Sequence, residues 1–332
     1  MITLVGIKII IRRLLLATAL GASACSVTGR PALAEWPDRP VRLVLPYGPG
    51  GVADVPARIL AEKLSEDLGQ RFVVENIPGA GGINAARAVL SAAPDGDTLG
   101  FVTNGNAIAT VMFQNLPYDP IRQFKMVSQV GEFTLVFAVN TKSPFKTLQD
   151  IIDFARSSPG KLNIGTVSIG STQNFSAELL KSMAGLSFQI IPFKTSPDVV
   201  VALLRGDIDM MIDFPVSIES QIEEGSIRYL ATTSRQRSSF VPTLPTVDES
   251  GVAGYETTSW NGVFAPKATP QDIIDAINGA IRKALASPDL IAKFKKIGIT
   301  AQASSPDQLR SKLEADIAKW EAVRVKSGIP KN

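Results

Sequence analysis

The feature that most constrains the fold is a unit that recurs along the chain: an apolar run, a polar or glycine-containing turn and an amphipathic segment. The first copy is VRLVLPY (41–47), followed by the turn Gly48–Gly51 and a helical pattern over 52–68. A continuous apolar run is typical of a strand that is buried on both faces. The alternation of such strands with helices predicts an α/β fold with mostly parallel strands.

The repeated units form two blocks, one on either side of Asn140. A later extended run near 257–264 would bring the chain back to the first block. That return would give two lobes joined by two crossing strands, although the pattern alone leaves it open. In the first block, Gly79–Gly82 and Thr103–Asn106 are expected to be turns that follow strands and point to the same rim.

The N-terminus has the features of an export signal. Basic residues precede the apolar run 14–24, and Ala32–Ala34 fits a cleavage motif of small residues, so 1–34 is predicted to be removed. The run is shorter than the roughly 20 residues that span a bilayer, so we expect a periplasmic protein and not an anchored one. Lipid attachment at Cys25 is the less favoured alternative, and Arg12-Arg13 leaves the export route open.

Composition excludes several classes of function. The chain has no His, and its one Cys lies in the predicted signal, so the mature part has no His-based triad, no His/Cys zinc site and no disulfide. We expect no metal and no cofactor. Without residues 1–34, which hold four basic and no acidic residues, the net charge is −1, which gives no indication of nucleic-acid binding.

The first glycine turn raises the question of a nucleotide. Gly48, Gly50 and Ala53 fit the dinucleotide pattern G-x-G-x-x-A. A turn of this kind directs backbone N–H groups at an anion, but the geometry does not choose between a pyrophosphate and a carboxylate, and a plain tight turn is the alternative. Two features count against NAD as the ligand. Export would take the chain to a compartment where NAD is scarce, and Pro49 removes a backbone N–H from the turn that would hold the phosphates. The ligand contacts predicted in this turn are Tyr47, Gly48, Gly50, Gly51 and Asp54.

A second turn of this kind, Ser168–Asn174, lies in the second block. Its hydroxyl and amide side chains either cap the following helix or donate to an anion. Since ligands of open α/β sheets bind beyond the carboxyl ends of strands, both turns are candidates for one site. Asp213 ends a strand and would accept from a ligand or only from a nearby N–H. The further predicted contacts are Thr103, Asn104, Ser168, Gly170, Ser171, Thr172, Asn174 and Asp213.

A series of motifs occurs in a fixed order along the chain: Pro40–Pro46, Pro49–Gly51 with Asp54, Val74–Asn76, Pro78–Gly82, Pro94–Gly96, Leu116–Asp119, Pro159–Leu162, Pro242–Thr246, Thr258–Trp260 and Phe264–Pro266. In this series the chain resembles the periplasmic substrate-binding proteins of tripartite tricarboxylate transporters, the Bug family. The resemblance runs from Trp36 nearly to the C-terminus. It implies a type II-like periplasmic-binding fold of two Rossmann-like α/β lobes around a cleft. We expect lobe 1 to comprise 35–139 with 262–332, and lobe 2 to comprise 140–261.

The resemblance also implies a function. Such proteins bind di- and tricarboxylates, acidic amino acids or aromatic acids through loop backbone groups and hydroxyls. We therefore expect a monomeric, non-enzymatic binding protein that captures a small carboxylate and delivers it to transporter membrane subunits. A sensor that serves a receptor kinase and an exported NAD-dependent oxidoreductase are the alternatives. Departures from the family pattern at Ser168–Asn174, Phe193–Thr195 and Ile212–Phe214 favour a more apolar ligand body.

Overall fold

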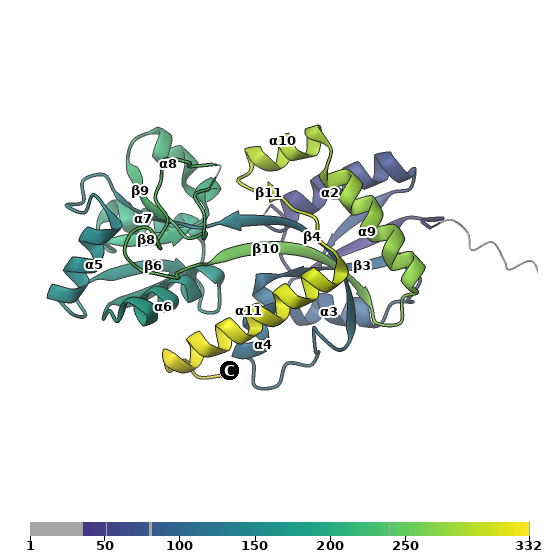
Figure 1. The fold of residues 1–332 in the computed structure, drawn as a ribbon, viewed down its shortest axis with the longest axis horizontal. Helices are drawn as coiled ribbons and strands as arrows, with labels where there is room; N and C mark the ends of the chain where they lie inside the picture. Colours follow the sequence, from purple (N-terminus) through teal and green to yellow (C-terminus); the bar gives the residue numbers. More distant parts are fainter. Residues whose placement is uncertain (1–35, 51, 80–81, 239, 332) are drawn as a thin grey trace, which may run out of the picture. The chain divides into compact units, whose positions relative to one another are not determined.

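The computed structural model describes residues 36–50, 52–79, 82–238 and 240–331 (Figure 1). The predicted export signal 1–34, the lipid-attachment alternative at Cys25 and the predicted ligand contact Gly51 lie outside the described residues. The chain from Pro37 onward forms one compact structural unit.

The described residues build two sheets (Figure 1). The first has the order β11 (Thr300–Ala301), β4 (Phe124–Thr134), β10 (Thr258–Pro266), β3 (Thr98–Thr103), β1 (Val41–Leu45), β2 (Phe72–Asn76). The second has the order β7 (Gln189–Phe193), β6 (Asn163–Val167), β8 (Met210–Asp213), β5 (Val136–Asn140), β9 (Ile227–Thr232). We call the first sheet with its helices lobe 1 and the second sheet with its helices lobe 2.

Helices accompany both sheets (Figure 1). Those of lobe 1 are α2 (Asp54–Leu68), α3 (Ile83–Leu90), α4 (Asn104–Met112), α9 (Gln271–Leu285) and α10 (Pro288–Lys296). Those of lobe 2 are α5 (Leu148–Ser157), α6 (Thr172–Ala184), α7 (Ser196–Arg205), the 3-10 helix η2 (Pro215–Ile218) and α8 (Glu219–Glu223). The last helix, α11 (Pro306–Lys326), contacts β4 and α4 of lobe 1 and also α6 of lobe 2.

The strands are less uniformly parallel than predicted. Strand β1 is parallel to β2 and β3, and β6 is parallel to β7 and β8, as expected for strands joined by helices. Strand β10 is antiparallel to β3 and β4, and β5 is antiparallel to β8 and β9. The reason is the crossing: β10 and β5 enter their sheets from the opposite lobe, against the direction of the neighbouring strands.

Two chain crossings join the lobes. Strand β4 ends in the first sheet at Thr134 and β5 begins in the second at Val136, so the chain changes lobe at Leu135. On the return, the Thr257 N–H donates to the Thr233 carbonyl at 2.9 Å, directly before β10. The structure therefore contains the return crossing that the pattern left open. The residue boundaries given for the lobes remain a prediction, and β5 already lies in the second sheet.

One prediction about local structure is wrong. Thr103–Asn106 is not a turn but the start of α4, with Thr103 as its N-cap. The Thr103 hydroxyl accepts from the Gly105 N–H at 3.1 Å, and the Asn106 side chain accepts from the Thr103 N–H at 2.9 Å. This reciprocal capping box satisfies two backbone donors at the helix start. The Asn-Gly-Asn sequence resembles a turn, but the capping side chains three residues apart decide for a helix.

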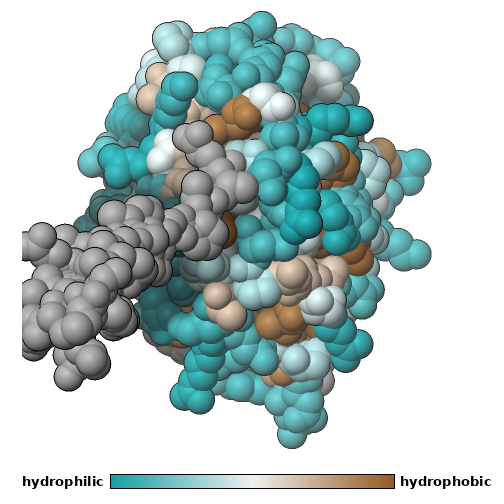
Figure 2. Space-filling view, turned by 90° about the vertical axis from the view of Figure 1, so that its right-hand side faces the viewer, coloured by the Kyte–Doolittle hydropathy of each residue, from teal (hydrophilic) through white to brown (hydrophobic). Residues whose placement is uncertain are grey.

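Apolar side chains are concentrated inside the lobes. The largest fully buried side chains include Trp260, Trp320 and Tyr255, which lie on β10, α11 and the segment before β10. On the face of lobe 1 shown in Figure 2, hydrophilic residues predominate and hydrophobic residues form small separate groups. None of the helices in the described ranges is long and apolar enough to cross a bilayer.

Candidate functional site

A cavity of about 540 Å³ lies where the two lobes meet above the crossing strands. This volume is in the range of small-molecule sites. Both lobes and both crossing strands contribute residues to its wall. The lining residues are Tyr47, Val52, Ala53, Gly79, Gly82, Thr103, Gly105, Asn106, Ile108, Ala109, Met112, Phe113, Phe133, Ser168, Ile169, Gly170, Ser171, Thr172, Gln173, Phe214, Ser259 and Asn261.

No charged side chain occurs among these described lining residues. The polar groups are hydroxyls, amides and backbone, and they come largely from the starts of α4 and α6. The N–H groups in the first turn of an α-helix have no partner within the helix and carry partial positive charge. Two helix N-termini at one cavity can therefore stabilise an anion without a cationic side chain.

The start of α6 is open toward the cavity. Gly170 has a φ of +84°, a conformation that side chains other than glycine rarely adopt, and a Cβ there would meet nothing within 4 Å. Ser171 is the N-cap, and its hydroxyl accepts from the Asn174 N–H at 3.1 Å. Thr172 and Gln173 occupy the first turn and line the cavity. The structure therefore brings together four of the predicted ligand contacts at this cavity: Ser168, Gly170, Ser171 and Thr172.

The turn before α2 differs, because an internal carboxylate already accepts one of its backbone N–H groups. Asp54 accepts hydrogen bonds from the Gly50 N–H, from Arg58 Nε and from Asn76 Nδ2, each at 2.9 Å. Burial would raise the pKa of Asp54, but these hydrogen bonds outweigh it and hold the pKa below its usual value. Asp54 does not line the cavity, so the structure gives no support to its predicted contact with a ligand.

The other predicted contacts of the first turn differ in which cavity they line. Tyr47 lines the cavity, and its hydroxyl hydrogen-bonds the Thr103 hydroxyl at 2.9 Å, which links this turn to the cap of α4. Gly50, with a φ of +81°, lines a smaller adjoining cavity. Gly48 is exposed and lines neither.

Asn104 joins the two lobes instead of facing the cavity. It is fully buried, its Nδ2 donates to Thr172 Oγ1 at 3.0 Å, and its Oδ1 accepts from Trp320 Nε1 at 2.8 Å. The Trp320 ring also meets the Phe175 ring of α6 edge-on. The predicted direct contact between Asn104 and a ligand therefore lacks support, because its amide already bridges α4, α6 and α11.

Asp213 lies behind the cavity wall, and its side chain is fully buried. Its Oδ1 accepts from the Phe214 N–H at 2.8 Å and from Gln173 Nε2 at 3.1 Å, and Gln173 itself lines the cavity. Its Oδ2 makes no hydrogen bond of ordinary geometry within the described residues. Burial raises the pKa of Asp213, although the Ser196 hydroxyl and the hydrogen bond from Gln173 act to lower it. The sequence left open whether Asp213 accepts from a ligand or only from a nearby N–H, and the structure shows acceptance from the Phe214 N–H.

Asn174 is buried beside the helix start. Its Oδ1 accepts from the Gly170 N–H at 3.4 Å, and its Nδ2 donates to Thr166 Oγ1 at 3.5 Å. The side chain is not part of the cavity wall and instead fixes the shape of the turn.

Several lining residues were missed from sequence. Ser259 and Asn261 alternate on β10 and so face the same side, which a period of two would have indicated. Asn261 Nδ2 also donates to the Val52 carbonyl at 3.1 Å, a contact between segments far apart in the chain. The cavity wall also contains Gln173, Phe133 and Phe214, which were not among the predicted contacts. Within the described residues, no group of three His, Cys, Asp or Glu side chains could hold a metal ion.

The sequence and the fold of this chain both match a known protein family. Residues 56–329 match the family described as "Tripartite tricarboxylate transporter family receptor". The Rhodopseudomonas palustris protein Rpa4515, solved with adipate, is 35% identical with a TM-score of 0.79, covering 90% of this chain and 100% of its own. MatC of the same organism, solved with malate, is 30% identical with a TM-score of 0.73, covering 87% and 99%.

A third solved structure is the periplasmic binding protein BugD, which is 29% identical with a TM-score of 0.75, covering 90% of this chain and 100% of its own. These similarities confirm the predicted two-lobe α/β fold and the resemblance to the Bug proteins. The matched family consists of receptors, which confirms the prediction of a binding protein and not an enzyme.

Proposed function

This chain belongs to the tripartite tricarboxylate transporter receptor family, and from that premise we propose that it captures a small carboxylate between its lobes and delivers it to the membrane subunits of such a transporter. Its place of work is the periplasm, after removal of residues 1–34. We propose that it acts as a monomer.

The observation that carries this proposal is the cavity at which two helix N-termini meet in the absence of charged side chains. A carboxylate needs several hydrogen-bond donors when it leaves water. First-turn N–H groups at the helix starts supply them, together with the hydroxyls of Ser168 and Thr172. The Ser171 hydroxyl donates to the Val167 carbonyl and caps α6, so it shapes the helix start and is not a donor to the ligand. Solved relatives with adipate and malate support the same class of ligand.

The proposed contacts follow the cavity wall. From the predicted set, Tyr47, Thr103, Ser168, Gly170, Ser171 and Thr172 are retained as contacts because they line the cavity. To them we add Gly105, Gln173, Ser259 and Asn261. Gly105 has no side chain, and a Cβ there would lie 2.2 Å from the Tyr47 hydroxyl oxygen, so close packing of Tyr47 on the start of α4 requires glycine at this position.

Capture would involve closure of the lobes about the two crossings. The hydroxyls of Thr134 and Thr232 hydrogen-bond at 2.7 Å at this junction. Across the cleft, Asn104 Nδ2 and Thr172 Oγ1 join the starts of α4 and α6 directly. A closed form held by such contacts is what the membrane subunits would recognise.

The test is calorimetric titration of the purified protein with malate, adipate, citrate and glutamate, each beside its uncharged amide. We expect at least one acid to bind and its amide to bind at least 100-fold more weakly, because the helix N-termini favour negative charge. Equal binding of acid and amide, or binding of neither these acids nor any alkyl monocarboxylate, would refute a carboxylate site.

A further inference from the structure

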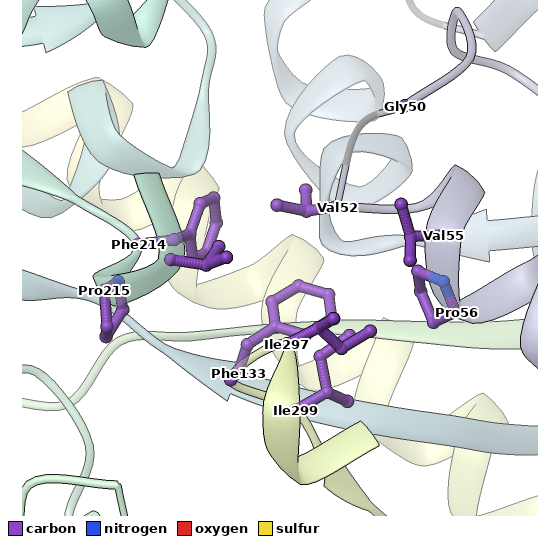
Figure 3. A pocket seen from close by; sticks show the side chains of 11 residues that line it. Gly50, Val52, Val55, Pro56, Phe133, Phe214, Pro215, Ile297 and Ile299 are labelled. Atoms are coloured by element: carbon purple, nitrogen blue, oxygen red, sulfur yellow. The ribbon is translucent and has the colours of Figure 1, made fainter. Parts of the chain in front are cut away.

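A second cavity adjoins the first and is entirely apolar in its side chains (Figure 3). Its volume is about 100 Å³. Its lining side chains include Val52, Val55, Phe133, Phe214, Val216 and Ile299. An apolar cavity of about 150 Å³ in another protein stays dry and holds benzene. The present one is large enough for a short alkyl chain or the edge of a ring.

Three residues line both cavities: Val52, Phe133 and Phe214. Figure 3 shows Val52 opposite Phe214, with Phe133 beside them. The rings of Phe133 and Phe214 meet edge-on with centroids 5.5 Å apart. The two cavities therefore meet at these three side chains, so a ligand whose carboxylate lies at the starts of α4 and α6 can direct its other end toward the apolar cavity.

The apolar character is specific to the cleft side of β4. Phe133 faces the two cavities, whereas its neighbours Glu132 and Thr134 line a separate cavity that also contains Arg235 and Glu256. Successive side chains of a strand face opposite sides, so one strand separates a charged environment from an apolar one. Val52 and Val216 are 37% and 39% exposed at this cavity, so burying apolar surface there is still available to a ligand.

We propose that this apolar cavity is the second half of the ligand site and receives the hydrocarbon end of an amphipathic acid. The proposal rests on the proposed function, because it needs the carboxylate at the helix N-termini. A carboxylate placed among Val55, Val216 and Ile299 would find no side-chain donor and would be strongly disfavoured. The preferred substrates are accordingly acids with an alkyl or aryl tail, and not long acids charged at both ends.

The experiment compares chain-matched pairs: butanoate, hexanoate and octanoate, each against the dicarboxylate of equal length, by calorimetric titration of the whole protein. We expect affinity to rise about fourfold per methylene that enters the cavity. We also expect octanoate to bind at least 30-fold more tightly than octanedioate. Affinity independent of tail length, or tighter binding of octanedioate, would overturn the proposal while leaving a carboxylate site intact. Failure of all six acids would refute the carboxylate site itself.

Two variants locate the effect. Val55→Phe fills the apolar cavity and should bring the ratio of octanoate to butanoate affinity close to one. Val201→Phe makes the same change at a position on α7 that is 46% exposed and lines neither cavity, and it should keep the wild-type ratio. Val216→Ala, which removes wall contacts and adds no bulk, should lower octanoate affinity several-fold. An unchanged ratio in both Val55→Phe and Val216→Ala would overturn the assignment.

Discussion

The turns that precede α2 and α6 have the same plan, yet the structure uses them differently. Each follows a strand, each has a glycine at positive φ and each opens a helix. In the first, the Asp54 carboxylate accepts the Gly50 N–H, so a backbone donor of this turn is satisfied by the chain itself. In the second, Ser171 caps with a neutral hydroxyl and leaves the helix N-terminus to the cavity. One internal acid therefore distinguishes the first turn from the turn at which we propose that the ligand carboxylate binds.

Both turns have a buried acid nearby, and its partners decide what it does. Asp54 has the Arg58 guanidinium and two further donors, and its pKa is lowered. Asp213 has one backbone and one amide donor, no cationic partner in hydrogen-bond contact among the described residues, and its pKa is raised. The Asp54 carboxylate, paired with Arg58, stabilises the turn that contains it. The Asp213 carboxylate lies behind Gln173 without a cationic partner in hydrogen-bond contact, so its ionised form destabilises the fold.

The largest effect should come from making the second turn like the first. Ser171→Asp keeps a good N-cap but adds a carboxylate where we propose that the ligand carboxylate lies. Repulsion between like charges at about 4 Å is worth about 4 kcal/mol at an effective dielectric constant of 20, so affinity for acids should fall at least 100-fold. Ser171→Asn, an equally good neutral cap, is the control and should lose less than about fivefold. Calorimetric titration that gives equal losses for both variants would contradict an electrostatic role.

The converse change makes the first turn like the second. Asp54→Asn removes the charge that pairs with Arg58, and we expect a loss of about 1–3 kcal/mol in the free energy of unfolding at pH 7. Since the pKa of Asp54 is lowered in the folded state, its contribution is present above the usual Asp pKa of about 3.9 and is lost as the pH falls through the folded-state pKa. Urea unfolding of both proteins at pH 7 and pH 3 measures this difference, which should shrink at pH 3.

Ligand affinity separates a structural from a binding role for Asp54. Because its carboxylate is turned into the chain and does not line the cavity, affinity should change less than threefold in Asp54→Asn. A tenfold loss of affinity with unchanged stability would return the first turn to direct ligand contact.

Sequence reasoning identified the turns but not which of them is open to the cavity. An apolar run and glycines located β1 and the two turns, because those signals are local. The occupation of the first turn by Asp54 depends on Asn76, which lies on the next strand, and on Arg58, one helical turn onward. A carboxylate in a glycine turn looks the same in sequence whether it faces outward or inward.

Long-range contacts explain the other omissions. Strand β4 was missed because Ser128, Gln129 and Gly131 interrupt its apolar pattern, and they are tolerated there because β10 and β11 pair with it on both sides. Asn104 looked like a free amide beside a glycine, but its partners Thr172 and Trp320 come from distant helices. The side chains that a fold brings together from distant segments cannot be assigned from one stretch of sequence.

Asp213→Asn tests a buried acid whose pKa is shifted in the opposite direction to that of Asp54. The amide oxygen can keep the hydrogen bonds from Phe214 and Gln173 while the charge is removed. The raised pKa of Asp213 means that ionisation costs stability once the pH rises above the usual Asp value of about 3.9. The variant should therefore be more stable than wild type by about 1 kcal/mol at pH 7, with the gap closing toward pH 4. Urea unfolding that showed a destabilised variant at pH 7 would indicate that the charge itself is needed.

The smallest effect should come from the link between the first turn and the start of α4. Tyr47→Phe removes the hydrogen bond between the Tyr47 and Thr103 hydroxyls but keeps the ring against Gly105. A neutral hydrogen bond contributes about 0.5–1.5 kcal/mol, and the Thr103 hydroxyl still accepts from the Gly105 N–H, so affinity should fall only about threefold. Tyr47→Ala removes the ring as well and should cost about tenfold more. If Tyr47→Phe cost as much as Tyr47→Ala in calorimetric titration, the hydroxyl and not the ring would be the contact that Tyr47 makes with the ligand, and the first turn would supply a polar contact despite the internal carboxylate of Asp54.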